Sequence, residues 1–341
     1  MEDIDLDTLI TMIYVFVDEW YQQEIMPVKL IRGRPAKCSD SEILTLAIIS
    51  EWRCGVSWET ERGFVRYIHK HYLQWFPTCP QRSGFNKRKR YLYGVLSELQ
   101  KYLATVLSDE ASIGYECVDC LPIPAGSLGQ YTRDKGHWLW ESTVGKGKDG
   151  WFWGDHLLAS VRSNGTLSGW LLGSAHINDR WLMEAFVSAC HSSPQLIEPP
   201  HRVRDGYASR RLPPIGFIGA WANVGEMSKQ PYLADKGFNG YRWRLHWQTH
   251  FDATVLSVPP NNSRQERPWI RQDKKWLASK RQIVETAFAI LTDVFKIKQL
   301  RAHSRWGQYT RITAKIVGYH FGIWINRLLG RNDFTHATLI C

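Results

Sequence analysis

The sequence of 341 residues predicts an α/β protein, in which a mixed β-sheet is flanked by helices and preceded by an all-helical region. Apolar residues recur at helical spacing through about the first 110 residues. From Ile113 the spacing changes to period two in short β-rich runs, and two long amphipathic stretches follow near the end of the chain. This order predicts a helical region at 1–110, a sheet domain at 111–305, and a C-terminal helix and tail at 306–341.

The N-terminal region is expected to hold short helices joined by tight turns. Ser39 and Glu42 form a capping box, in which Ser39 caps the amide of Glu42 and Glu42 reaches back to Ser39. A helix is therefore expected to begin there and to end by Gly55. Two more helices are predicted at about 58–72 and 85–107. Short helices in this arrangement are typical of a helix-turn-helix-like unit.

The sheet domain is expected to begin with strands joined as a hairpin. Its predicted strands cover 113–119, 151–162, 166–175, 231–235 and 253–258. Asn164 and Gly165, between the second and third of these, predict a type I′ turn. A stretch rich in proline and glycine at 192–230 is predicted to be an insertion or a long loop. Helices are expected at about 181–189, 274–295 and 309–329.

The chain carries a formal net charge of +10, and its cations gather in two regions. Residues 29–95 hold 13 basic and 5 acidic residues, and residues 264–315 hold 13 basic and 4 acidic ones. Two such regions favour a long polyanionic partner, without distinguishing nucleic acid from an acidic membrane surface. Cations that simply cover solvated helix faces explain the same pattern.

The cysteine content and the apolar runs bear on the compartment. Seven cysteines, an odd number, do not resemble the disulfide framework of a secreted domain, so a reducing cytoplasm is expected. The longest apolar run near the N-terminus, residues 8–17, is too short to span a bilayer and has acidic flanks. We therefore expect neither a membrane anchor nor a membrane partner.

Three acidic residues are candidate ligands of divalent metal ions. Asp119 ends the first predicted strand, which Pro122 is expected to stop, and Asp235 ends a later strand. Glu285 lies in a predicted helix, one turn after Arg281 and on the same face. Mg²⁺ and Mn²⁺ prefer carboxylate oxygens, and two ions about 4 Å apart can activate an attacking oxygen and stabilise a leaving one. Taken singly, each aspartate also fits a turn former or an ion-pair partner, and Glu285 fits a surface salt bridge.

Three sequence blocks carry a family resemblance that covers nearly the whole chain. They are Val118–Pro124, Leu233–Phe238 and Lys280–Glu285. In order and spacing they resemble the three blocks of DDE transposases from bacterial insertion sequences. The helix that starts after Ser39 and the segment Phe85–Arg90 are similar to those of the insertion-sequence 982 group.

The resemblance implies a ribonuclease-H-like fold, with Asp119 on the first strand, Asp235 after the fourth and Glu285 on a following helix. It implies that these residues are catalytic and hold two Mg²⁺ or Mn²⁺ ions. The implied activity is cleavage at the ends of an insertion sequence, followed by attack of the freed 3′-hydroxyl on target DNA. The implied partners are double-stranded DNA, as terminal inverted repeats and target, and further copies of the chain in a homodimer or higher oligomer. The implied location is the cytoplasm, in association with the nucleoid.

Some positions depart from the related patterns. Trp153–His156 resembles the hairpin motif of the family, but Asp155 stands where a lysine is common, which puts a phosphate contact there in doubt. Asp179 lies in a segment similar to one between the first two acids and is expected to support the metal ligands at best. The stretch at 192–230 is longer and richer in proline than the resemblance implies.

Ten cations are expected to contact DNA. Four of them open the helix predicted at 85–107, where cations oppose the helix dipole, which favours a binding role over a solubilising one. The others precede or begin the helix of Glu285. The ten are Lys87, Arg88, Lys89, Arg90, Arg264, Arg267, Arg271, Lys274, Lys275 and Arg281.

Two alternative functions fit the same features. One is a ribonuclease-H-like nuclease that only hydrolyses DNA, and the other is a catalytically retired transposase that acts as a DNA-binding regulator. The intact set of three acids argues against the regulator. The nuclease differs in its products, because strand transfer joins DNA to DNA whereas hydrolysis leaves only cut ends.

Overall fold

The chain forms two compact units in the computed structural model, which describes residues 4–28, 36–108, 114–126, 128, 142–147, 150–191, 221–225, 228–259, 269–302 and 304–340. The first, here called the helical unit, comprises Met1–Leu103 and Ala289–Cys341, and the second, the sheet unit, comprises Ala104–Phe288. The structure thus divides the chain differently from the predicted ranges. The C-terminal part at 306–341 belongs with the N-terminal helices, and the sheet unit ends at Phe288 instead of 305.

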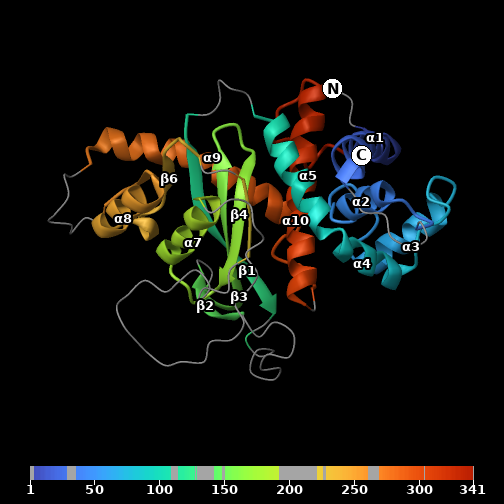
Figure 1. Ribbon diagram of the computed structural model, residues 1–341, viewed down its shortest axis with the longest axis horizontal. Coiled ribbons are helices and arrows are strands. Elements are labelled where there is room, and N and C mark those ends of the chain that lie inside the picture. Colours follow the sequence, from blue (N-terminus) through green and yellow to red (C-terminus); the bar gives the residue numbers. More distant parts are fainter. Residues whose placement is uncertain are drawn as a thin grey trace. The chain divides into compact units, whose positions relative to one another are not determined.

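The sheet unit is built on one mixed sheet (Figure 1). Its strands are β1 (Glu116–Gly126), β2 (Thr143–Gly147), β3 (Gly150–Arg162), β4 (Leu167–Ser174), β5 (Trp221–Val224), β6 (Tyr232–Ala234) and β7 (Val255–Ser257). They lie in the order β5-β4-β3-β1-β6-β7, and β2 pairs with β3. β1 is antiparallel to β3 and parallel to β6, and β6 is parallel to β7. The prediction of a mixed α/β sheet is confirmed.

β1 extends well past the end predicted for it. Asp119 is its fourth residue, and the strand continues through Pro122 and Pro124 to Gly126. β6 pairs only as far as Val118, so beyond this point β1 is hydrogen-bonded to β3 alone among the described residues. The two prolines are two residues apart, so their nitrogens point to the same side of the strand, where no amide donor is needed. The prediction that Pro122 stops the strand was therefore wrong.

Part of the predicted loop at 192–230 is a strand. Residues 221–224 form β5, which pairs antiparallel with β4 from Gly169 to Leu172. This pairing gives hydrogen-bond partners to the outer edge of β4. The rest of the stretch, at 192–220 and 226–227, lies outside the described residues.

Helices cover both faces of the sheet, and the alternation along β1 decides which side chains meet them. Val118 packs in a core with residues of α7 (Asp179–His191) and α8 (Tyr241–Phe251), a helix that the sequence did not predict. Cys117 lies on the opposite face, where its thiol donates to the carbonyl of Lys280 in α9 (Arg271–Asp293) at 3.4 Å. Asp119, two residues after Cys117, therefore shares the face that α9 covers.

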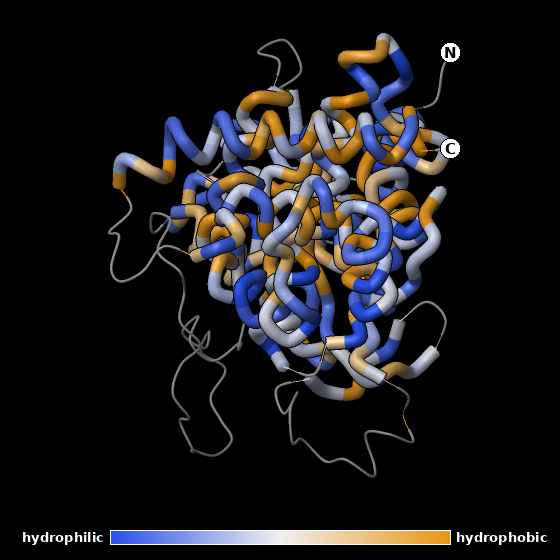
Figure 2. Tube along the Cα trace, turned by 90° about the vertical axis from the view of Figure 1, so that its right-hand side faces the viewer, coloured by the Kyte–Doolittle hydropathy of each residue, from blue (hydrophilic) through white to orange (hydrophobic). Residues whose placement is uncertain are grey.

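The helical unit contains α1 (Leu6–Trp20), α2 (Asp40–Ile49), α3 (Glu61–His71), α4 (Arg82–Tyr91), most of α5 (Tyr93–Val106) and α10 (Arg305–Leu328), with the short turns η1 (Tyr21–Ile25) and η2 (Met26–Val28). Most residues of α2 and α10 are buried, so these two helices form its centre. Figure 2 shows apolar and hydrophilic residues alternating along the chain trace. Within the described residues, no helix combines the length and the apolar composition needed to cross a bilayer.

The helix predicted at 85–107 is two helices. α4 ends at Tyr91, Leu92 leaves the helical conformation with ψ of 13°, and α5 begins at Tyr93. The indole N–H of Trp306 donates to the carbonyl of Arg90 at 3.0 Å, which satisfies one of the groups freed by the break. Three of the four clustered cations consequently lie in the last turn of α4, where they complement the helix dipole. The expectation that they oppose the dipole at a helix start was wrong.

The predicted capping box at the start of α2 is confirmed. The amide of Glu42 donates to Ser39 Oγ at 3.0 Å, and the amide of Ser39 donates to Glu42 Oε2 at 2.5 Å. Ser39→Ala removes the first bond and is expected to lower the free energy of unfolding by about 1 kcal/mol, measured by urea denaturation. Ser39→Thr keeps the hydroxyl and serves as the control. Equal losses in both variants would show that the cap hydroxyl is not what stabilises this end of α2.

Candidate functional site

Two of the predicted metal ligands lie where the pairing of two neighbouring parallel strands ends. The pairing between β1 and β6 ends at Val118 and Ala234. Asp119 and Asp235 come directly after this pair, so their carboxylates start from adjacent positions of the sheet. The sequence indicated only that the two could converge if their strands were neighbours, and the structure places these strands side by side.

One guanidinium holds both carboxylates. Nη2 of Arg281 lies 2.7 Å from Asp119 Oδ2, and Nη1 lies 3.4 Å from Asp235 Oδ1. The side chain of Arg281 is 14% exposed, whereas that of Asp235 is 50% exposed. The site is therefore enclosed on the side of α9 and open to solvent at Asp235.

The environment of Asp119 disfavours its charged form. Burial raises its pKa above the ordinary value, Arg281 and the amide of Cys120 act in the opposite direction, and the charges of Asp235 and Asp179 raise it further. The Cys120 amide donates to Asp119 Oδ1 at 2.8 Å. A buried carboxyl group stays ionised only while a cation is close to it. The protonation of Asp119 therefore depends on which cation it contacts.

Asp179, at the start of α7, is a further carboxylate beside this pair. Its charge helps to raise the pKa of Asp119. Burial raises the pKa of the Cys120 thiol, and the charge of Asp179 is the next largest cause of that shift. Gly237 leaves room for it, because a Cβ at that position would lie 2.5 Å from Asp179 Oδ2. Asp179 was expected to support the metal ligands at best, and its charge acts on the carboxyl group of Asp119.

A pocket of about 500 Å³ opens beside Asp235. Its polar lining consists of Asp235, Lys236, Lys274 and Arg281, and the rest of its wall is apolar. Three cations against one carboxylate favour an anionic ligand. Lys274, one of the cations expected to contact DNA, is part of this wall. Arg271 and Lys275, on the first turns of α9, are exposed, whereas Arg264 and Arg267 lie outside the described residues.

The structure does not bring Glu285 to the pair. Glu285 is exposed on α9, and no group of three Asp, Glu, His or Cys side chains close enough to hold a metal ion occurs among the described residues. Arg281, one turn earlier on the helix, occupies the position next to Asp119 and Asp235. Helix phase alone made Glu285 and Arg281 equivalent, because residues four apart share a face.

The hairpin motif, Trp153–His156, lies in the sheet unit, and its acidic residue is shielded from solvent. Asp155 is fully buried and accepts a hydrogen bond from Ser142 Oγ at 2.9 Å. Burial lowers the pKa of the adjacent His156. Asp155 therefore lies inside the sheet unit, and the doubt about a phosphate contact at this position agrees with its burial.

The four cations of α4 have different environments. Lys87 is exposed and Arg90 partly so, while Arg88 pairs with Asp40. Lys89 is 2% exposed, with its ammonium 2.9 Å from Glu61 and 3.2 Å from Glu51. A buried cation with two carboxylate partners cannot reach DNA, so the prediction that Lys89 contacts DNA was wrong.

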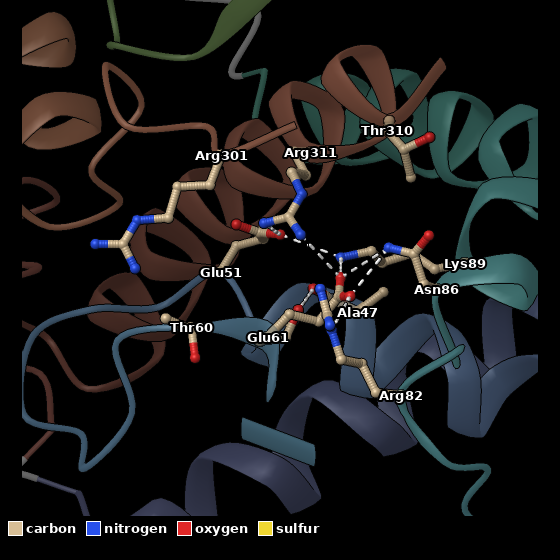
Figure 3. Close-up of polar contacts among 12 residues, drawn as sticks. Ala47, Glu51, Thr60, Glu61, Arg82, Asn86, Lys89, Arg301, Thr310 and Arg311 are labelled. Atoms are coloured by element: carbon tan, nitrogen blue, oxygen red, sulfur yellow. Dashed lines mark hydrogen bonds and ion pairs between the residues drawn. The ribbon is translucent and has the colours of Figure 1, made fainter. Parts of the chain in front are cut away.

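Lys89 belongs to a buried charge cluster that the sequence did not reveal (Figure 3). Glu51 pairs with Lys315 at 2.7 Å and with Arg53 at 3.6 Å, and Arg311 lies 3.1 Å from Glu61. The sequence feature that could have predicted this cluster is a charged residue next to or within an apolar run. Glu51 follows the apolar α2, and Lys315 interrupts the apolar α10. Charges at such positions are buried only when they are paired.

No protein-family model, no curated protein and no solved structure matches this chain.

Proposed function

We propose that the chain is a DNA transposase of the DDE type, which cleaves DNA at the ends of an insertion sequence and transfers the freed strand into target DNA. The observation that carries the proposal is the carboxylate pair of Asp119 and Asp235, which come directly after the paired residues of the neighbouring parallel strands β1 and β6 and are held by one cation. Beside the pair lies a pocket lined by three cations. Such a site suits phosphoryl transfer on a polyanion.

The strand order supports a ribonuclease-H-like sheet for this unit. β1, β3 and β4 are successive antiparallel neighbours, and β6 and β7 continue the sheet in parallel from the other side of β1. With β2 and β5 taken as additions, Asp119 lies on the first strand and Asp235 follows the fourth, as the resemblance implies. A helix-turn-helix-like DNA-binding role is proposed for the helices α2, α3 and α4.

The carboxylate pair fits a hard divalent cation, Mg²⁺ or Mn²⁺. Because one guanidinium contacts oxygen atoms of both aspartates, a single cation in its place is within reach of both. When bound, the metal activates an attacking oxygen and stabilises the leaving one. Asp119 and Asp235 would hold it, and Glu285 is the proposed additional ligand of a two-ion site. Arg281 has to release the carboxylates first, since its guanidinium contacts the oxygen atoms that would bind the metal.

The remaining residues of the pocket bind and orient DNA in this proposal. Lys236, Lys274 and the released Arg281 neutralise phosphates next to Asp235. In the first step water attacks the phosphodiester at the end of the element, and a 3′-hydroxyl leaves. In the second step that 3′-hydroxyl attacks a phosphodiester of target DNA and displaces another 3′-hydroxyl. The proposed assembly is a homodimer or higher oligomer on double-stranded DNA, in the cytoplasm with the nucleoid.

A catalytically retired DNA-binding regulator is the second candidate. Two observations favour it. Arg281 contacts both aspartates, and the exposed Glu285 is part of no three-ligand group among the described residues. A regulator without catalytic activity would bind DNA but produce neither cut nor joined DNA in the presence of a metal ion.

The deciding experiment incubates the purified protein with Mg²⁺ and DNA carrying the terminal repeats, and separates the products by size. We expect joined products with the wild-type protein and their loss with Glu285→Gln, because an amide is a poorer ligand for a hard cation than a carboxylate. Cut ends without joined DNA would favour the nuclease, and no product at all would favour the regulator. Joining unaffected by Glu285→Gln would remove Glu285 from the proposed ligands.

A further inference from the structure

A basic pocket of about 650 Å³ lies within the helical unit, and none of the residues that line it belongs to the carboxylate site. Four arginines line it, namely Arg82, Arg90, Arg301 and Arg311. Glu61 is the sole carboxylate of the lining. A concave surface with this charge ratio attracts an anion.

The pocket is formed by one face of α4 and the start of α10. Arg82, Asn86 and Arg90 are four residues apart along α4 and so share a face. On another face of the same helix, Phe85 and Lys89 are buried. Arg82 and Arg90 therefore lie on the face of α4 that lines the pocket, where Arg82 Nε is 3.9 Å from Glu61.

Charge balance shows that the pocket has positive charge to spare. Among the described residues, the charge cluster that includes the lining residues Glu61 and Arg311 sets Arg53, Lys89, Arg311 and Lys315 against Glu51 and Glu61. Burial lowers the pKa of Lys315 to about 8, although Glu51 opposes this shift. Excess positive charge in a buried network is stabilised by an added anion.

Two of the pocket arginines point to a ligand. In the described part of the chain, neither Arg90 nor Arg301 has a carboxylate within ion-pair distance, and each guanidinium donates to a backbone carbonyl at 3.4 Å. The guanidinium of Arg301 lies outside the network of dashed contacts in Figure 3. Guanidinium groups bind phosphate through paired N–H donors, and helix N-termini add to such sites. Gln81 and Ser304, the N-caps of α4 and α10, both line the pocket.

A second basic pocket of about 310 Å³ adjoins the first. Arg66, His69 and Lys70 of α3 line it, and Gln81 is common to both pockets. Two anion sites that share a wall suit successive phosphates of one strand better than a single free anion.

We propose that these two pockets bind consecutive backbone phosphates of a nucleic-acid strand. The inference rests on the proposed function only for the choice of DNA as that nucleic acid. It assigns the main phosphate contacts of the helical unit to Arg82, Arg301 and their neighbours, residues outside the ten cations expected from the sequence apart from Arg90.

The test measures binding of a labelled DNA duplex by fluorescence anisotropy, over a series of salt concentrations and with EDTA so that no metal chemistry contributes. The variant Arg82→Gln/Arg301→Gln changes two exposed side chains and is expected to fold, which a melting curve checks. We expect DNA affinity to fall about tenfold or more, and the salt slope to fall by about two, because two phosphate contacts are lost. Arg62→Gln, at an exposed arginine of α3 that lines neither pocket, is the matched control and is expected to have little effect.

The outcomes separate this inference from the proposed function. If wild type binds DNA and the double variant binds it equally well, the pockets are not the phosphate sites, and the transposase proposal stands. If inorganic phosphate raises the melting temperature of wild type but not of the double variant while DNA affinity is unchanged, the pocket takes a free anion and the inference is wrong. Loss of binding in the double variant together with an inactive wild type would support the pockets and overturn the transposase.

Discussion

Asp119→Asn is expected to reduce DNA cleavage and strand joining by roughly a thousand-fold or more, because metal stabilisation of phosphoryl transfer is worth several kcal/mol. Asparagine keeps the shape and one oxygen of the aspartate, so the amide of Cys120 retains an acceptor. The measurement follows cut and joined products over time with Mg²⁺ and with Mn²⁺. Asp235→Asn is expected to behave in the same way.

The stability of this variant is expected to move in the opposite direction from its activity. Burial raises the pKa of Asp119, so at neutral pH its ionised form is less favourable in the folded chain than in the unfolded one. A neutral isostere removes that penalty, and thermal melting at pH 7 should show Asp119→Asn to be at least as stable as wild type. The penalty in wild type fades as the pH falls through the raised pKa, so the difference between the two proteins should shrink on acidification.

Asp252→Asn provides the matched control. Asp252 ends α8 in the left-handed conformation that asparagine also tolerates, is exposed, and does not line the pocket beside Asp235. Its activity is expected to stay near that of wild type. Full activity in Asp119→Asn, or an equal loss in Asp252→Asn, would contradict the assignment of Asp119 as a metal ligand.

Glu51→Gln is expected to destabilise the helical unit by about 3–5 kcal/mol, because it leaves buried cations without their counter-charge. Glu51 Oε2 lies 2.7 Å from Lys315 Nζ, and Oε1 lies 3.2 Å from Lys89 Nζ. Burial opposes the ionisation of Glu51, but the charges of Lys315 and Lys89 outweigh it and hold its pKa well below the ordinary value. The contribution is present above the ordinary pKa of a glutamate and is lost as the pH falls through the depressed value.

Denaturation in urea measures this effect, and Glu98→Gln is its control. Glu98 pairs with Lys101 at 2.9 Å in the same unit, but its side chain is 58% exposed. An exposed pair of this kind contributes about 0.5 kcal/mol or less, because water screens both charges. A loss below about 1 kcal/mol in Glu51→Gln would show that the cations find other partners or water when the carboxylate is removed.

The hairpin at Asn164 and Gly165 shows what local sequence can and cannot predict. The prediction of a hairpin is confirmed, since β3 and β4 pair on either side of these residues. The prediction of a type I′ turn was wrong, because only Gly165 has a positive φ, of +88°. Asn164 donates to the carbonyl of Leu107 at 2.8 Å and accepts from Thr166, and these bonds fit a longer turn. Contacts with a distant segment selected the turn type, which turn composition alone does not contain.

The candidate site divides in the same way. The adjacent positions of Asp119 and Asp235 were predictable, because in both strands a change from apolar residues to an acid marks the end of the β1–β6 pairing. β1 itself continues beyond this point. The choice between Arg281 and Glu285 was not, because both lie on the same face of α9 and only packing decides which side chain reaches the aspartates. The prediction of a DNA contact for Lys89 was wrong for a related reason. Four consecutive residues of a helix point in different directions around it, so one of the four cations faces the core.

The shared partners within the buried cluster constrain how this sequence can change over generations. Lys89 contacts both Glu51 and Glu61, and Arg311 contacts the same two carboxylates. Loss of either glutamate leaves buried cations without their counter-charge, so single changes there are selected against while combined changes to apolar residues are tolerated. These positions, scattered from α2 to α10, should therefore vary together or not at all, as one inherited unit.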